Sequence, residues 1–542
     1  MSKTIFKLSS VTLALVGSFS VNAAIYNIYG YQPVINGNAK TYGVAIEPGA
    51  ANCWSGTTCS QTNYKISFEE KLYNEGFAYR DEVPFRYNLG YDLIDNDGSS
   101  IYDGFKSYCN SFLGYNDAGC SRWADEQYNQ GYAQELNGNV DDSSTYIENS
   151  SDQVESGQNN VIVNNFTSAA ADAIGTYYGG SLLQRTIAFS GGTALDRDTY
   201  NQSKAWAKTS NGTNDIIVGS VSKQSTQNTN DYISSAAIWS TGGGAPVVIP
   251  WEGAAEESRR TPQGSARDVA IVNSQTYAVG YNSDADERPV ASVFTVDRSG
   301  PSVSSRQVVS RFSSNSYLNS LFTAINENGY AIGEAKYATP INSAYANSLF
   351  YITDPANPNG SFNEFSGPIF FSGANGKAGA INNNDEAVGA IDYQTHAEVN
   401  GDQGKQRGQR AFIAPLNSSN TKAPLNGRAW YLDDLVNDGN PNSTNNQFRV
   451  IDATDINDAG VISGTAYYCE GGYDTLYLDS KCNDGSTQGA EKIVAVKLVP
   501  IENSTASNIQ QRGLEPVSID RQGGSLGWFA LVVIGLLGFR RK

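Results

Sequence analysis

One short pattern recurs along the middle of this chain and limits the folds that the chain can adopt. The pattern runs aliphatic-Asn-x-x-Gly/Asp-x-small-aliphatic-Gly, and "AINENGYAIGEA" from Ala324 to Ala335 is a clear copy. Its closing glycine recurs every 53 to 75 residues, at Gly219, Gly280, Gly333, Gly389 and Gly464. A repeat of this period indicates one supersecondary unit per copy, with the units stacked in a row or arranged around an axis.

Each copy predicts a β-hairpin. The Asn-rich turn, as in Asn326 to Gly329, supplies residues that accept φ > 0 between two short apolar strands. The closing glycine falls inside the second strand, which indicates a bulge or a close backbone approach. Another apolar run follows each copy, such as "RAFIAP" from Arg410 to Pro415. We therefore predict an all-β, β-propeller-like array of four-stranded units, with about seven or eight blades.

The repeat also resembles a known sequence family. A hairpin of this type followed by a short His-Ala-Phe-hydrophobic strand resembles the HAF repeats of exported bacterial proteins. "RAFIAP" is the nearest copy of the second element, although the namesake histidine is absent from every copy. The resemblance implies a propeller-like fold and an extracellular setting, and it implies no reaction.

The first 23 residues have the layout of a secretory signal peptide. Lys3 and Lys7 form a positive region, Val11 to Phe19 is apolar, and a small-x-small site ends at Ala23. We expect signal peptidase to cut there, so that the mature chain begins at Ala24. The apolar region is too short to span a membrane by itself.

The last twenty residues predict a second processing signal. Leu526 to Phe539 is an unbroken apolar run, and three cations follow it. As a helix it would be about 21 Å long against a hydrocarbon core of about 30 Å. Cations remain on the cytoplasmic side, so the rest of the chain would lie across the membrane.

Gly523, Gly524 and Ser525, the apolar run and the terminal cations together resemble the GlyGly-CTERM sorting signal of Gram-negative bacteria. That resemblance implies cleavage near the glycine pair by a rhomboid-type protease (rhombosortase), export by the type II secretion machinery, and release or display at the cell surface. The alternative is a periplasmic protein that its C-terminal helix anchors permanently.

Six cysteines fit an oxidising compartment. They lie as local couples, which predicts three short disulfide loops: Cys53 with Cys59, Cys109 with Cys120, and Cys469 with Cys482. Metal ligation is the rival interpretation. No C-x-x-C motif occurs, and the one histidine, His396, is remote from every cysteine.

The remaining chain divides by composition. Residues 24–140 form a disulfide-containing β region with the first blade or blades and a short helix over Cys120–Leu136, and 141–160 read as a polar linker or long loop. Residues 161–500 carry the repeats, 501–524 read as a stalk, and 525–542 form the sorting tail.

The net charge of −18 argues against two classes of partner, nucleic acid and anionic lipid. Nucleic acid requires a basic footprint, and anionic lipid also attracts cations. The acidity is typical of a soluble exported protein.

The sequence offers few residues that could form a catalytic site. A Ser-His-Asp or Cys-His arrangement would need His396, which follows the fourth hairpin among polar loop residues and is typical of a solvated loop histidine. Glycoside hydrolysis needs only carboxylates, and Asp81 with Glu82 is the first pair to consider.

A calcium site is the one cofactor that the sequence suggests. The loop "DLIDNDGSSIYDG" places Asp95, Asp97 and Asp103 together, with oxygen donors that suit Ca²⁺. The spacing does not match an EF-hand, and a plain Asx-rich turn is the favoured interpretation of the loop.

Six tryptophans of the mature region would serve either a glycan-binding face or the core: Trp54, Trp123, Trp206, Trp239, Trp251 and Trp430. Trp239 and Trp430 lie inside apolar strands, which favours core packing for those two. We therefore expect a non-catalytic exported protein that binds a glycan or an envelope protein, or serves as a scaffold. The alternative function is a secreted, carboxylate-dependent polysaccharide hydrolase.

Overall fold

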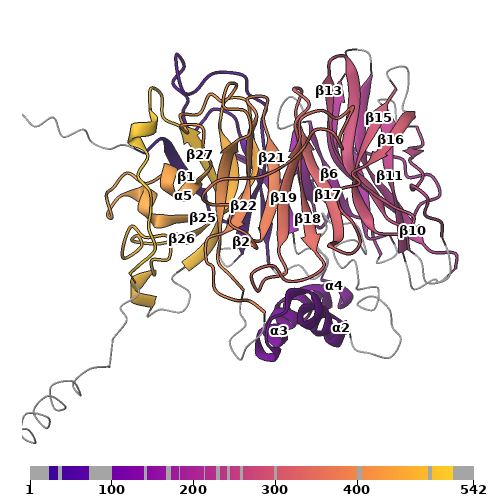
Figure 1. The fold of residues 1–542 in the computed structure, drawn as a ribbon, viewed down its shortest axis with the longest axis horizontal. Coiled ribbons are helices and arrows are strands. Elements are labelled where there is room, and N and C mark those ends of the chain that lie inside the picture. Colours follow the sequence, from indigo (N-terminus) through magenta and orange to yellow (C-terminus); the bar gives the residue numbers. More distant parts are fainter. Residues whose placement is uncertain are drawn as a thin grey trace, which may run out of the picture.

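A computed structural model describes residues 24–516, apart from residues 35–38, 73–100, 140–142, 167–171, 182–183, 211, 213, 228–231, 241–243, 257–260, 298–301, 400–405 and 486–490. The described strands form seven antiparallel sheets, of which six have four strands and one has three. The sheets follow one another along the chain as the blades of a propeller (Figure 1). The all-β propeller prediction is confirmed, with seven blades.

The first strand of each blade lies nearest the axis. The first blade contains β2 (Lys40–Ile46), β3 (Ile66–Lys71) and β4 (Ser143–Ile147), and the second contains β5 (Ile162–Phe166), β6 (Ala173–Tyr178), β7 (Thr186–Ser190) and β8 (Thr193–Ala194). The third blade contains β9 (Gln202–Ser210), β10 (Asp215–Gln224), β11 (Tyr232–Ser240) and β12 (Val247–Val248). The fourth blade contains β13 (Gly264–Val272), β14 (Gln275–Ser283), β15 (Pro289–Val296) and β16 (Val303–Val308). The fifth blade contains β17 (Tyr317–Ile325), β18 (Ala331–Tyr337), β19 (Asn347–Ile352) and β20 (Phe362–Glu364). The sixth blade contains β21 (Gly376–Ile381), β22 (Glu386–Asp392), β23 (Gln409–Pro415) and β24 (Trp430–Tyr431). The seventh blade contains β25 (Phe448–Ile456), β26 (Ile462–Cys469), β27 (Glu491–Pro500) and β1 (Tyr26–Tyr31).

The two ends of the described chain close the ring within the seventh blade. β1 pairs with β27 in antiparallel register, with Tyr26 opposite Pro500 and Tyr31 opposite Ala495. The outermost strand of that blade therefore comes from the N-terminus and its other three strands come from the C-terminal part. This pairing removes the open edge that a linear array of sheets would leave.

The closing glycine of the repeat permits a bulge in the strand beside it. Pairing between β17 and β18 shifts at Thr323, which follows Phe322, the partner of Gly333. A Cβ on Gly333 would lie 2.2 Å from the carbonyl oxygen of Leu321, a distance that no side chain tolerates. The other closing glycines face their first strands in the same way, with distances of 1.9 to 2.4 Å for Gly219, Gly280, Gly389 and Gly464. The predicted close backbone approach is confirmed.

The Asn-rich turns use the first asparagine as a cap. The side-chain oxygen of Asn326 accepts hydrogen bonds from the backbone N–H groups of Asn328 (3.1 Å) and Tyr330 (2.9 Å). Gly329 has φ of 87°, the left-handed conformation that the Gly/Asp position of the repeat predicts. Asp385 (φ 58°) and Gly460 (φ 81°) occupy that position in the next two copies.

Apolar side chains fill the space between successive blades. Val218 and Ile238 of the third blade, for example, lie in one buried cluster with Ala266 and Phe294 of the fourth. Trp239 and Trp430 are 1% and 8% exposed, as their predicted core role requires.

A helical insertion between β3 and β4 lies at one end of the propeller (Figure 1). It contains α2 (Ile101–Tyr108), a π-helix (Cys109–Leu113), α3 (Asp117–Ala124), a second π-helix (Asp125–Tyr132) and α4 (Ala133–Leu136). Gly114 of this insertion lies close to Val399 and Tyr345. Those residues follow β22 and β18, so the insertion touches the ends of the blades opposite the Asn-rich turns.

The short helices elsewhere are α5 (Leu432–Leu435) and the 3-10 turns Thr444–Gln447, Asn483–Gly485 and Ala506–Asn508. The three disulfides form as predicted, Cys53–Cys59, Cys109–Cys120 and Cys469–Cys482.

The two ranges predicted from composition to be a linker or long loop (141–160) and a stalk (501–524) both contain ordered structure. β4 lies within the predicted linker, and residues 501–516 of the predicted stalk lie against the propeller. Arg512 is 3% exposed there, and its backbone N–H donates to Asp434 at 2.6 Å.

Both predicted export signals lie outside the described residues, as do Ala23 and the tail from Gly523 to Ser525. Ala24 is the first described residue, and it is buried. Within the described part of the chain, no helix is long and apolar enough to cross a membrane.

Candidate functional site

A polar cavity of about 1080 Å³ lies on the propeller axis. Residues from the first strand of all seven blades line it, between the level of the bulges and the Asn-rich turns. Its mouth includes the exposed residues Pro48, Ser210 and Glu327. The cavity therefore opens at the face opposite the helical insertion.

The bulges supply one side chain from nearly every blade to the cavity wall. Each bulge places an extra residue in the first strand, and such a residue turns out of the regular alternation of the sheet. The extra residues that line the cavity are Val44, Asn164, Trp206, Arg267, Thr323, Gly379 and Thr454. The repeat thus builds a ring of variable positions around one space.

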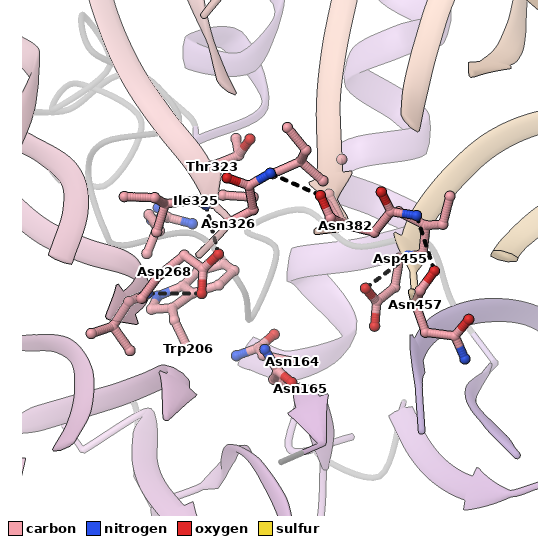
Figure 2. Close-up of a pocket in the computed structure, with 18 of the residues that line it drawn as sticks. Asn164, Asn165, Trp206, Asp268, Thr323, Ile325, Asn326, Asn382, Asp455 and Asn457 are labelled. Atoms are coloured by element: carbon pink, nitrogen blue, oxygen red, sulfur yellow. Dashed lines mark hydrogen bonds between the residues drawn. The ribbon is translucent and has the colours of Figure 1, made fainter. Parts of the chain in front are cut away.

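Two carboxylates on opposite sides of this cavity tie neighbouring blades together. Asp268 accepts hydrogen bonds from the backbone N–H groups of Val269 and Ile325, both at 2.8 Å. Asp455 accepts from Ile456 at 2.8 Å and from Ile46 at 2.9 Å. Ile325 and Ile46 each belong to the next blade, so each carboxylate bridges a blade junction. Figure 2 shows the two carboxylates across the cavity from each other.

Both carboxylates bind protons more strongly than ordinary aspartates. Burial at the cavity wall and, to a smaller extent, the charge of Asp455 raise the pKa of Asp268 to about 7, although hydrogen bonds from two backbone N–H groups lower it. Burial raises the pKa of Asp455 to about 6. Each side chain is only half-buried by accessible area, because it borders the cavity, yet it lies too deep for full hydration.

A chain of asparagines runs around one side of the cavity (Figure 2). The side-chain amide of Asn326 donates to the backbone oxygen of Asn382 at 2.9 Å, and Asn382 donates to Asn457 at 3.1 Å. Asn457 then donates to Glu47 at 2.9 Å. Each bond crosses one blade junction, from the fifth blade to the first.

Two aromatic side chains line the cavity among the described residues, Phe166 of the second blade and Trp206 of the third. The Arg267 guanidinium lies 3.8 Å from the centre of the Trp206 ring and 5.5 Å from that of Tyr281. Beside them, the Lys208 ammonium lies 2.9 Å from Asp172 and 3.5 Å from Asp215. Trp206 is the tryptophan that the structure assigns to the cavity.

The other predicted site residues lie elsewhere. Asp81, Glu82, Asp95 and Asp97 fall outside the described residues, and Asp103 is an exposed residue in the first turn of α2. Within the described ranges no group of three or more His, Cys, Asp and Glu side chains is arranged to hold a metal ion. His396 lies in the loop after β22, near the helical insertion and away from the cavity.

Asp268 and Asp455 were not predicted from the sequence, although the sequence holds a signal for one of them. Nine residues before the closing glycine, two copies of the repeat have alanine, at Ala324 and Ala380, and the last copy has Asp455. A carboxylate at a small-residue position is conspicuous once the copies are aligned. Asp268 lies three residues further from its glycine, because its hairpin is longer.

Sequence comparison places the chain in a family. Residues 256–542 match the family model described as "Protein of unknown function (DUF3466)", and the chain belongs to that family. The matched range takes in the last four blades except for β1, and it includes Asp268 and Asp455. No curated protein matches the chain.

Solved structures with similar shapes are distant. A protein of unknown function from Dyadobacter fermentans aligns with 8% identity and a TM-score of 0.36, over 88% of this chain and 98% of its own. A thermostable family-43 glycoside hydrolase aligns at 10% identity and a TM-score of 0.24, over 54% and 87%. The Trypanosoma rangeli sialidase aligns at 8% identity and a TM-score of 0.31, over 62% and 54%.

Proposed function

We propose that this protein is an exported binding protein whose central cavity takes a hydroxyl-rich ligand, a carbohydrate. The observation that carries the proposal is the cavity itself, a polar space of about 1080 Å³ on the axis, with side chains from every blade in its wall. Cavities of this size, with a few fixed polar groups and an aromatic face, are typical of ligand sites.

The wall chemistry suits sugar hydroxyls, which both donate and accept hydrogen bonds. Six asparagines line the cavity among the described residues, and their amides offer both functions. Trp206 offers an aromatic ring of the kind on which the apolar face of a sugar packs. Asn164 and Asn165 lie near Trp206 in the cavity (Figure 2).

A glycan array followed by calorimetry with the best oligosaccharides tests this proposal. We expect the Trp206→Ala and Asn165→Ala variants to weaken binding at least about tenfold, because each removes a wall contact. Tyr477→Ala, on an exposed aromatic residue of the seventh blade, is the matched control and should bind normally. Absence of binding to every carbohydrate would overturn the proposal.

A second candidate function rests on the two raised pKa values. A carboxyl group that keeps its proton near neutral pH is what a glycoside hydrolase uses as its general acid, and a second carboxylate completes the pair. The pKa values of Asp268 (about 7) and Asp455 (about 6) lie in the range that a general acid needs near neutral pH. Both oxygens of each group already accept backbone N–H bonds, however, which favours the binding role.

Product analysis after incubation with polysaccharides separates the two functions. A hydrolase would release oligosaccharides and would lose that activity in both Asp268→Asn and Asp455→Asn. A binding protein would release none.

Export also belongs to this proposal. The signal peptide that ends at Ala23, the HAF-like repeats and the GlyGly-CTERM-like tail point to the cell surface or the medium by way of type II secretion. Intact mass of the C-terminal peptide from medium and membranes tests the sorting step. A terminus near Gly524 is expected, and a peptide that still carries Leu526 to Lys542 in every fraction would instead indicate a permanent periplasmic anchor.

A further inference from the structure

The charges around the cavity are strongly unequal. Among the described lining residues seven are acidic, namely Asp172, Asp215, Asp268, Glu327, Glu334, Asp455 and Asp458, and three are basic, namely Lys208, Arg267 and Lys377. A concave site lined by one sign of charge concentrates ligands of the opposite sign. The imbalance therefore favours a ligand that carries positive charge.

The three cations of the wall are each held against another group. Lys208 is ion-paired with Asp172, and Lys377 is ion-paired with Asp452 at 2.5 Å. The guanidinium of Arg267 is stacked over Trp206. These contacts keep the cations at the wall, whereas Asp268 and Asp455 face each other across the space between (Figure 2).

The two facing carboxylates are rigidly placed. Two backbone N–H groups hold each of them, and in both cases one donor comes from the neighbouring blade. A fixed carboxylate does not need to reorganise when a cation arrives, so more of the attraction appears as affinity. The cavity also keeps the pair from full hydration, which strengthens charge interactions inside it.

We infer that the carbohydrate of this cavity is an amino sugar with an unsubstituted amine, whose ammonium group binds between Asp268 and Asp455. The inference rests on the proposed function and adds the chemical class of the ligand. The neighbouring hydroxyls of such a sugar would meet the asparagine side of the wall.

The raised pKa values of the two carboxyl groups lead to a further measurable expectation, the release of protons when the ligand binds. The charge of Asp455 contributes to the raised pKa of Asp268, so the two carboxylates repel each other in the empty cavity. An ammonium group between them would lower both pKa values and release protons on binding. The other charged groups of the lining are Asp172, Lys208, Asp215, Arg267, Glu327, Glu334, Lys377 and Asp458.

Calorimetry with two matched sugars tests the inference. The probes are the tetrasaccharide of glucosamine and the tetrasaccharide of N-acetylglucosamine, which differ in charge and the acetyl group. At pH 6.5 and low salt we expect the glucosamine probe to bind at least about tenfold more tightly. Titrations in buffers of different ionisation enthalpy should also show proton release for the glucosamine probe alone.

Substitutions of Asp268 and Asp455 test whether these two carboxylates cause the preference for the glucosamine probe. Asp455→Asn and Asp268→Asn preserve the side-chain shape and remove one ionisable carboxyl group each, and each should reduce the preference for the glucosamine probe at least about fivefold. Asp286→Asn, on an exposed aspartate in the β14–β15 loop, is the charge-matched control and should preserve it. Thermal unfolding verifies that each variant is folded.

The outcomes separate this inference from the proposed function. Equal or tighter binding of the acetylated probe overturns the amino-sugar inference and leaves carbohydrate binding in place. Binding of 1,4-diaminobutane with neither sugar overturns the amino-sugar inference and leaves a cation site, and the glycan array then decides the proposed function. Binding of none of the three probes overturns the inference, and the glycan array then decides the proposed function.

Discussion

The backbone oxygen of Lys204 lies 1.9 Å from the point that a Cβ atom on Gly219 would occupy. The two residues lie on β9 and β10, where the pairing register shifts. The contact is between backbone atoms, so no side-chain movement can relieve it.

Gly219→Ala should therefore destabilise the protein by about 3 kcal/mol, because the added methyl group must push two strands apart. Chemical denaturation measures the change. Gly244→Ala is the control, since a Cβ at Gly244 has no atom within 4 Å and its φ is not positive. Equal stability of the two variants would show that the bulge yields easily.

The asparagine chain makes a second prediction. Asn382 accepts from the backbone N–H groups of Asn384 and Glu386 and donates to Asn457 and to the Glu386 carboxylate. Asn382→Ala leaves these buried groups without partners and should cost about 2 to 3 kcal/mol.

The measurement is again the free energy of unfolding. The control is Asn442→Ala, because Asn442 is exposed in the loop before β25. A loss below about 0.5 kcal/mol for Asn382→Ala would indicate that water replaces the missing amide.

The fold was largely readable from the sequence because its signal is periodic. The asparagine, the Gly/Asp position and the closing glycine each have a backbone role, and every copy must meet it. Gly329 is left-handed, and Gly333 faces a carbonyl oxygen. Physical requirements of this kind repeat with the fold, so one chain suffices to find them.

The site was not readable because it lies where the copies differ. The bulge positions carry valine, asparagine, tryptophan, arginine, threonine or glycine, and no spacing distinguishes Asp268 from the other 54 acidic residues. Only the ring closure by β1 and β27 brings residues of the first and fourth blades to one cavity. Position around the axis is a property of the closed ring and has no local signature.

The raised pKa values predict how stability depends on pH. An aspartate has an unfolded pKa of about 3.9, and that of Asp268 is about 7 in the folded protein. The folded protein therefore binds more protons between these values, and its stability falls as pH rises from about 4 to 7. Asp455 contributes in the same direction up to about pH 6.

Asp268→Asn should show a smaller loss of stability between pH 5 and pH 8 than the unsubstituted protein. Asp392 and Asp434, with pKa values raised to about 6 and about 7 by burial, remain in both proteins, so the difference between the two curves isolates Asp268. Denaturation at four pH values measures the curves, with Asp286→Asn as control. Parallel curves for Asp268→Asn and the unsubstituted protein would mean that Asp268 is ionised throughout this range.

The last described segment predicts a local effect. The guanidinium of Arg512 donates to the backbone oxygens of Asp433 (2.8 Å) and Leu476 (3.0 Å) and to the side chain of Asn446 (2.9 Å). Burial lowers the pKa of Arg512, while Asp433 and Asp434 favour its charged form. The side chain thus fastens residues 501–516 to the seventh blade and to α5.

Arg512→Ala should detach this segment while the propeller stays folded, because removal of one partner from a buried charged cluster costs about 3 to 5 kcal/mol. Limited proteolysis with thermolysin should then cut near Ile509 or Leu514 at least about tenfold faster. The control Gln511→Ala changes an exposed neighbour and should resist cleavage as the unsubstituted protein does. Unchanged cleavage in Arg512→Ala would mean that other contacts suffice to hold the segment, and global unfolding would mean that the segment is part of the closure of the ring.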